Sequence, residues 1–338
     1  MNPVTMVAGR AAVGMAEAGG TPTGMSLLSD YFGRDRRATA FGIWYISSGI
    51  GFALALFVGG WIVQHHDWRW AFVAAGIPGL VLAPLLWLTV REPRRGAQDG
   101  IALRAAATAT GTASGTTAHA PLRQRLGLLF TRPGLGLCIA AITCIAAGIY
   151  GMSTWLATFL IDSHGFTIAG SGMTVAIAYG ILGSIGGLGA GWGADWLNRR
   201  RGGFDPAHTA RLGAVIPMVA ALAGLGAVGA ATAPRSIGCI MLAGLFSASY
   251  NGPIYAVIVT QAGPDLRGLA VSAVQMSANL IGVGAGAWMI GKVSDLVSGR
   301  NGVAWGIGTA MLFCLAGGVL LLMAARQISQ NPDPEPVP

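Results

Sequence analysis

Two charged residues near the start of the chain interrupt an apolar stretch, and their types suit proton exchange. Arg10 and Glu17 are seven positions apart, so on a helix they share one face, about 10 Å apart along the axis. Gly14 lies between them and leaves room for water or a substrate. A charge at the centre of a bilayer costs about 2.5–3.5 kcal/mol on insertion scales, which marks a functional position. We predict that Glu17 exchanges protons and that Arg10 tunes it or anchors a substrate anion. The alternative is a charge network that only holds helices together.

The composition indicates that the elements positioning these residues are membrane-spanning helices. Of 338 residues, 53% are hydrophobic and only 10% are charged, whereas soluble domains carry about 25% charged residues. Eight uncharged runs reach the roughly 20 residues that a helix needs to cross the hydrocarbon core. These runs are 38–66, 70–90, 133–161, 163–194, 212–234, 236–264, 268–291 and 301–325. With the opening segment 2–28 they predict an all-α integral membrane protein of nine transmembrane helices.

The distribution of cations predicts the orientation of these helices. Of the 21 cationic residues, sixteen fall in alternate loops, four in the intervening loops, and Arg10 within a helix. Cytoplasmic loops carry such an excess of Lys and Arg. We therefore expect a multi-pass protein of the cell (inner) membrane with a cytoplasmic C-terminus. The net charge of +8 follows from this topology and does not indicate a nucleic-acid partner.

The chain divides unevenly and contains an internal repeat. We expect a partial N-terminal half over residues 1–90, a cytoplasmic linker over 91–132, a six-helix half over 133–326, and a disordered cytoplasmic tail over 327–338. The segments DYFGRDRRATAFG and TQAGPDLRGLAVS are similar and place Arg37 and Arg267 230 residues apart. Parallel repeats of this kind relate the two halves of a large class of transporters.

The motifs and their order resemble the major facilitator superfamily, and within it the bacterial spinster-like branch. WRWAF (68–72), GIPGL (76–80) and REP (91–93) match that branch, and GWGADWLNRR (191–200) resembles a loop signature of the whole superfamily. Its fourth-helix pattern is matched by Arg10, Gly14, Glu17, Ala18, Pro22, Asp30, Tyr31, Phe32, Arg36 and Arg37. The resemblance implies a major facilitator fold of which nine helices (3+6) of the usual twelve are present, the first three being absent. The fifth-helix antiporter motif is not matched at positions 55–60, so antiport is not supported.

The resemblance also implies a gate at the cytoplasmic end. The superfamily's loop signature is carried here by Gly191, Asp195, Arg199 and Arg200. In such a gate Asp195 would meet the N-terminus of the helix that starts near Arg37, assisted by Arg199 and Arg200. Asp30 and Arg37 could belong to the same gate. The alternative is that Asp195 is a solvated loop charge.

Polar and aromatic residues within the predicted helices are candidates to line a substrate cavity. They are Tyr150, Trp155, Tyr179, Tyr250, Asn251, Tyr255, Gln275 and Asn279. Each could instead be an interfacial anchor or an interhelical hydrogen bond. The four cysteines form no metal-ligand or redox pattern. His65, His66 and Asp67 are the one dense cluster in the sequence with metal-ligand chemistry, and a hydrated interfacial loop is the simpler account of them. We expect no catalytic residues, no metal and no cofactor.

These observations predict a secondary active transporter that works by alternating access and is not an enzyme. Its partners would be protons, a small-molecule substrate and the lipid bilayer, and we expect a monomer. The spinster-like resemblance implies an amphipathic or lipid-like substrate. An organic-anion/proton symporter and a non-transporting fragment of an incomplete gene are the alternatives.

Overall fold

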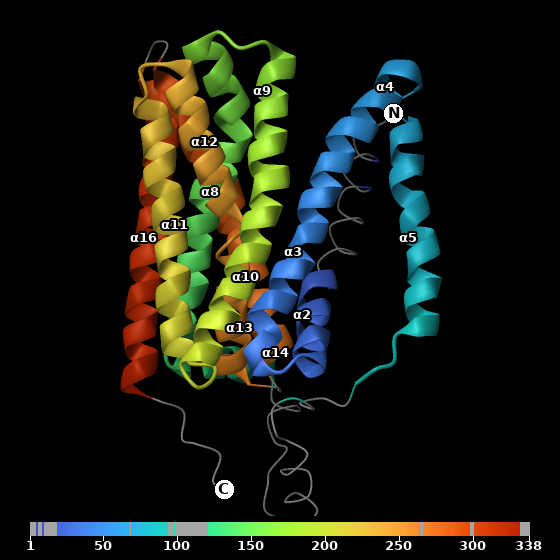
Figure 1. Cartoon of the computed structure of the whole chain (residues 1–338), viewed down its shortest axis with the longest axis vertical. Helices are drawn as coiled ribbons and strands as arrows, with labels where there is room; N and C mark the ends of the chain where they lie inside the picture. The colour runs from blue at the N-terminus through green and yellow to red at the C-terminus, as the bar shows by residue number, and fades with distance from the viewer. Residues whose placement is uncertain are drawn as a thin grey trace, which may run out of the picture.

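The computed structural model describes residues 19–67, 69–93, 121–263, 266–297 and 301–331, with the isolated positions 5, 9 and 98. Every regular element in these ranges is helical (Figure 1). The N-terminal segment comprises α2 (Gly20–Tyr31), η1 (Arg34–Arg36), α3 (Arg37–Leu54), η2 (Ala55–Gly59), α4 (Gly60–His65) and α5 (Arg69–Thr89). The C-terminal segment comprises α7 (Leu122–Thr131), α8 (Leu135–His164), α9 (Ile168–Val175), η3 (Ala176–Leu182), α10 (Gly183–Arg200), α11 (Pro206–Gly229), α12 (Ala233–Ser247), α13 (Asn251–Ala262), α14 (Arg267–Ser277), η4 (Ala278–Val283), α15 (Gly284–Leu296) and α16 (Gly302–Gln330).

Seven helices in the described part of the chain are long and apolar enough to cross a membrane. They cover Arg69–Thr89, Leu135–His164, Ile168–Arg200, Pro206–Gly229, Ala233–Ala262, Arg267–Leu296 and Gly302–Gln330. The π-helical turns η3 and η4 lie within two of these spans, and η2 joins α3 to α4. The predicted all-α membrane fold is confirmed, whereas the count of nine helices stays a prediction. Most of the predicted first helix, including Arg10 and Glu17, lies outside the described residues.

The C-terminal segment forms a bundle around α8. This helix is apolar on every face and packs along α16, which also packs along α11. Such a helix is stable only when neighbours surround it. Its fully buried side chains include Leu135, Ile145, Met152, Leu156 and Leu160. The hydrophobic core of the molecule therefore lies in this bundle.

Helix α5, unlike α8, is exposed along its whole length. It has no buried residue, packs against α4 and η2, and stands apart from the C-terminal bundle (Figure 1). Its exposed apolar side chains, with Trp87 81% exposed, are suited to lipid or to further helices. The predicted absence of three preceding helices stays a prediction.

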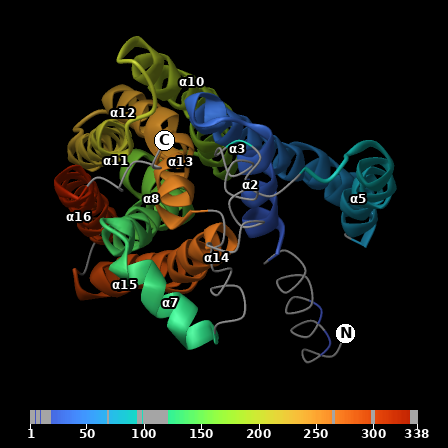
Figure 2. The same cartoon turned by 90° about the horizontal axis from the view of Figure 1, so that it is seen from below.

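The two segments meet at the lower end of Figure 1, where α3 packs on α10 and α13, and α2 packs on α14. Figure 2 shows α3 beside α10 from that end. Glycines permit this approach. A methyl group added at Gly191 or Gly252 would lie 2.5 Å or 2.7 Å from the carbonyl oxygen of Ala38. Toward the upper end of Figure 1, α3 diverges from α9. We call the contact between the segments the seam and its end the seam end.

Two helices extend into segments that we expected to be a linker and a disordered tail. Helix α7 lies inside the expected linker, and α16 continues to Gln330, beyond the expected start of the tail. Residues 94–97, 99–120 and 332–338 lie outside the described residues. The four-part division stays a prediction.

The close contact of α15 with α8 gives a test of the packing. A methyl group at Gly286 would lie 2.8 Å from Cα of Ala147, whereas one at Gly284 meets nothing within 4 Å. We expect Gly286→Val to reduce stability by about 1–3 kcal/mol through overpacking. Gly284→Val, with the same change in helix propensity, is the control. Thermal unfolding in detergent compares them, and equal melting temperatures would contradict the packing.

Candidate functional site

A buried ion pair joins the two segments at the seam end. The carboxylate Oδ1 of Asp30, at the end of α2, accepts a hydrogen bond from Nη1 of Arg267, at the start of α14, over 3.0 Å. The side chains are only 8% and 2% exposed. Removing one partner of a buried pair costs about 3–5 kcal/mol because the other charge is left uncompensated. The pair therefore holds α2 and α14 in one register.

Arg37 makes the reciprocal contact. Its guanidinium donates to the carbonyl oxygen of Ser29 at 2.9 Å and to the hydroxyl of Thr260, on α13, at 3.2 Å. Arg37 and Arg267 are 230 positions apart (267 − 37), and so are Asp30 and Thr260 (260 − 30). Each arginine thus reaches across the seam to the equivalent position of the other repeat, where Arg267 meets a carboxylate and Arg37 meets a neutral hydroxyl.

Asp195 caps the N-terminus of α3. Its Oδ2 accepts hydrogen bonds from the backbone N–H of Thr39 at 2.7 Å and from the Thr39 hydroxyl at 2.5 Å. The first N–H groups of a helix lack partners within the helix, and its positive end favours an anion. Asp195 is fully buried. Its carboxylate therefore contacts the opposite segment rather than solvent.

The other gate candidates lie around this cap. Gly191 is the position on α10 where the backbone of Ala38 approaches most tightly. Arg199 donates from Nη1 to the carbonyl oxygen of Asp35 at 3.0 Å. Arg200 instead lies over the ring of Trp196, 3.9 Å from its centroid. The structure brings Asp30, Arg37, Asp195 and Arg199 to the seam end and directs Arg200 to its own helix.

Several cavity candidates gather around Tyr255, on α13. The Tyr255 hydroxyl donates to Oε1 of Gln275 at 2.8 Å. The ring of Tyr45, on α3, lies 5.7 Å from that of Tyr255. Tyr250, next to the start of α13, is buried, and Tyr150, on α8, is 50% exposed. We use the name tyrosine cluster for Tyr45, Tyr150, Tyr250, Tyr255 and Gln275. It joins α3 to α8, α13 and α14.

The remaining cavity candidates are placed differently. The Asn251 amide donates to the carbonyl oxygen of Ala248 at 3.1 Å, at the break between α12 and α13. The Trp155 indole donates to the carbonyl oxygen of Ala287 at 3.0 Å, which makes it an interhelical contact. Tyr179 and Asn279 lie in η3 and η4. Isolated π-helical turns occur frequently at functional sites.

Sequence reasoning missed three residues of these sites. It did not assign Arg267 or Thr260 to the gate, although the 230-residue repeat spacing from Asp30 and Arg37 was a usable signal. It also missed Tyr45, whose partner Tyr255 lies far along the chain. The predicted proton site, Arg10 and Glu17, lies outside the described residues.

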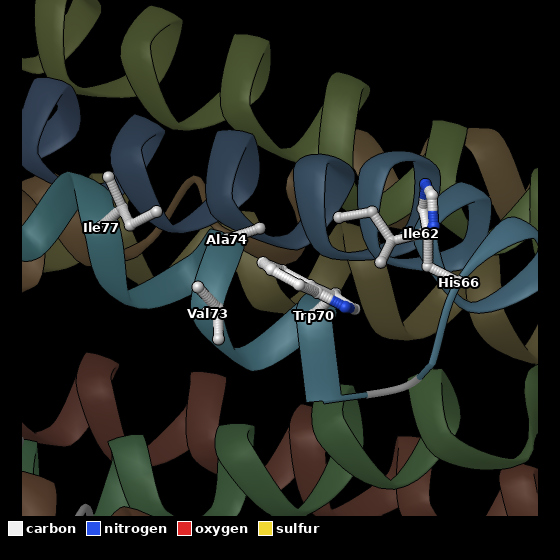
Figure 3. Close-up of a pocket in the computed structure, with 6 residues that line it drawn as sticks. All are labelled: Ile62, His66, Trp70, Val73, Ala74 and Ile77. Carbon is white, nitrogen blue, oxygen red and sulfur yellow. The ribbon is translucent and has the colours of Figure 1, made fainter.

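A pocket of about 420 Å³ lies between α4 and α5, and none of its lining residues belongs to the tyrosine cluster (Figure 3). Ile62 and His66 line one side of it, and Trp70, Val73, Ala74 and Ile77 line the α5 side. Nearby, Asp67 forms an exposed ion pair with Arg69 at 2.9 Å. In the part of the chain that the structure describes, no three potential metal ligands gather. The pocket is an apolar cleft between two helices.

Helices that cross a membrane, arranged in two segments that meet at one end, define a multi-pass membrane protein of the transporter type. The chain belongs to the Major Facilitator Superfamily, whose family model matches residues 1–287. Members of this superfamily carry small molecules across membranes and are not enzymes.

Curated relatives agree with this assignment. The chain is 28% identical over 322 residues to an MFS-type efflux pump of Mycolicibacterium smegmatis, covering 94% of this chain and 67% of the pump. It is 28% identical to a gallate transporter of Pseudomonas putida, covering 59% of this chain and 47% of that protein. A probable galactarate/D-glucarate transporter of Escherichia coli is 26% identical, with 95% and 72% covered. Protein spinster of Drosophila melanogaster is 28% identical over 46% of this chain and 23% of its own length.

Solved structures show the same fold. A bacterial homologue of the human lysosomal transporter Spinster has a TM-score of 0.57 at 22% identity, covering 92% of this chain and 75% of that chain. The fucose:proton symporter of Escherichia coli has a TM-score of 0.64 at 15% identity, with 94% and 74% covered. The resemblance to the major facilitator superfamily, with spinster proteins among its relatives, is confirmed.

The ion pair gives a test of the seam. We expect Asp30→Asn to destabilise the seam end by about 3–5 kcal/mol, because Arg267 keeps its charge without a counter-ion. A cysteine at Ala270, a fully buried position on α14, in a background without the native cysteines, should react faster with an aqueous thiol reagent. The double variant Asp30→Asn/Arg267→Gln removes the stranded charge and should label more slowly than the single variant. If the cysteine at Ala270 were labelled at the same rate in the parent and in both variants, the Asp30–Arg267 ion pair would not be what keeps the seam end closed.

Proposed function

We propose that this chain is a secondary active transporter that works by alternating access, with the seam end as its closed gate. The observation that carries the proposal is the buried Asp30–Arg267 ion pair across the seam, at the end where the segments converge, while α3 and α9 diverge at the opposite end (Figure 1). Transporters of this architecture rock their two halves around a central site. The seam end would open when the other end closes.

The chemistry of the seam suits repeated opening. Its polar contacts, Arg267 with Asp30, Arg37 with Thr260, and Asp195 with Thr39, are directional bonds that water can replace once the segments separate. Between these bonds, Gly191 and Gly252 pack against the carbonyl oxygen of Ala38 through their backbone atoms. No side chains interlock at these two positions. Packed interfaces of this kind have discrete arrangements rather than a continuous range. The seam is therefore a two-state element.

Proton coupling through Glu17, with Arg10 as its regulator or as an anion anchor, is part of the proposal. The support is the sequence: both charges interrupt an apolar segment where an ionised group is costly. Desolvation disfavours the charged carboxylate and favours proton uptake.

For the substrate we propose a small hydroxylated organic acid. Two relatives are named as transporters of gallate and of galactarate/D-glucarate. Gln275 accepts from Tyr255 through Oε1, which leaves its amide N–H groups to donate to a carboxylate or hydroxyl. Arg10 would supply the positive charge. An amphipathic substrate is the second candidate, favoured by the similarity to protein spinster and by the aromatic character of the tyrosine cluster.

The proposal includes an orientation. The seam end carries Arg34, Arg36, Arg37, Arg199 and Arg200, and the positive-inside rule assigns such loops to the cytoplasm. The gate would then close the cytoplasmic side of a multi-pass protein of the inner membrane. We propose that the protein acts as a monomer.

Glu17→Gln tests the coupling. Uptake of labelled gallate or D-glucarate into proteoliposomes should respond to an imposed pH gradient in the parent chain. The variant should lose that response yet keep exchange of internal for external substrate, because a neutral amide binds no proton. Glu92→Gln, at an exposed position, is the matched control. A normal gradient response in Glu17→Gln would contradict the assignment.

The Tyr255–Gln275 hydrogen bond tests the site. Tyr255→Phe removes the donor and frees Gln275 to turn, so we expect about tenfold weaker substrate affinity, equivalent to a buried hydrogen bond. Tyr31→Phe, which removes a hydroxyl at an exposed position, is the control. Competition with gallate, D-glucarate and a lysophospholipid separates the two substrate candidates. Unchanged affinity for every transported compound would exclude the tyrosine cluster.

A further inference from the structure

A second pocket of about 420 Å³ lies over the seam, and both segments contribute to it. Its polar side chains are Arg36 from η1, Thr39 from α3 and Arg199 from α10. Its large apolar side chains are Phe32, Ile43 and Trp192. We call this site the seam groove. It is distinct from the tyrosine cluster, with which it shares no residue.

The polar part of the seam groove is suited to an anion. Arg36 and Arg199 are exposed and come from opposite segments. The bond from Arg199 to the Asp35 carbonyl oxygen at 3.0 Å holds its guanidinium at the groove. Asp35 is flanked by Arg34 and Arg36, so η1 keeps a net positive charge. Guanidinium groups are well matched to phosphate in charge and geometry.

The apolar part of the groove is suited to hydrocarbon. Phe32, Ile43 and Trp192 are 41%, 56% and 56% exposed. Ile43 lies one turn beyond Thr39 on α3, and Trp192 lies two turns from Arg199 on α10. On both α3 and α10, exposed apolar side chains therefore lie one or two turns from the polar end of the groove.

The position of the groove matches a membrane–water interface. The rings of Trp192 and Trp196 stack with centroids 6.3 Å apart, and Arg200 lies over Trp196. Tryptophan is enriched at the level of lipid headgroups, with cationic side chains beside it. A site at this depth is open to the headgroup and the acyl chain of one lipid.

We propose that the seam groove binds an anionic glycerophospholipid of the surrounding leaflet. Its phosphate would lie between Arg36 and Arg199, and an acyl chain would follow Ile43 and Trp192. A soluble anion would use the arginines alone and leave the apolar part unused. The phospholipid matches both parts.

Because the two arginines belong to different segments, the bound lipid bridges the seam. The groove exists as one site only while α3 and α10 are in contact. A ligand that binds one of two conformations shifts the population toward it. The lipid therefore favours the conformation in which the seam end is closed.

Native mass spectrometry of the purified chain in detergent tests the binding. Phosphatidylglycerol should be retained by the parent chain and phosphatidylcholine should not. The double variant Arg36→Gln/Arg199→Gln should bind phosphatidylglycerol roughly tenfold more weakly, and Trp192→Ala should also weaken it. Arg326→Gln and Trp288→Ala, which change an exposed arginine and an exposed tryptophan outside the groove, are the matched controls and should bind as the parent does.

Three results would overturn the proposal. Equal weakening in the controls would mean unspecific attraction of lipid, and displacement by inorganic phosphate alone would mean a free-anion site. If phosphatidylglycerol failed to slow labelling of a cysteine at Ala270, the bridging role would be wrong. None of these measurements uses transport, so failure of the proposed transport function leaves the lipid result unaffected.

Discussion

A charge that is removed from water must find its partner within the protein, and this constraint fixes how the two segments meet. Asp30 ends α2 and Arg267 begins α14, and each would be buried alone if the segments separated without admitting water. Their bond therefore sets the register of α2 against α14. The bonds from Thr39 to Asp195 likewise set the register of α3 against α10. The close backbone contacts at Gly191 and Gly252 are possible only in that register.

The internal repeat makes the seam reciprocal but not symmetrical. Asp30 and Thr260 are equivalent positions, as are Arg37 and Arg267, and each arginine contacts the other repeat. An ionised acceptor forms a stronger bond than a hydroxyl does. The α2–α14 side of the seam is thus held by an ion pair, and the α3–α13 side by a hydrogen bond from the charged Arg37 to a neutral hydroxyl. This difference gives the two repeats unequal roles at one interface.

Helix α3 connects the sites that we describe. Thr39 near its N-terminus meets Asp195, Ile43 one turn later lines the seam groove, and Tyr45 faces Tyr255 in the tyrosine cluster. These positions occupy about two helical turns. A tilt of α3 relative to α10 would therefore change the gate, the groove and the cluster together. Rigid helices transmit a displacement along their length, which couples sites that share no contact.

The class of the protein follows from its amino-acid sequence. Long uncharged runs admit only helices in hydrocarbon, because every backbone group must be bonded within its own segment, and the ordered motifs identify the superfamily. The resemblance of these motifs to the superfamily also directed attention to Asp30, Arg37, Asp195 and Arg199, and implied that Asp195 meets the N-terminus of the helix near Arg37. The packing of the helices was needed to pair Asp30 with Arg267 and Arg37 with Thr260. Asp30 and Arg267 are 237 positions apart, and Tyr45 and Tyr255 also lie far apart along the chain. The spacing of residues within one helix carries no information on which helices pack together.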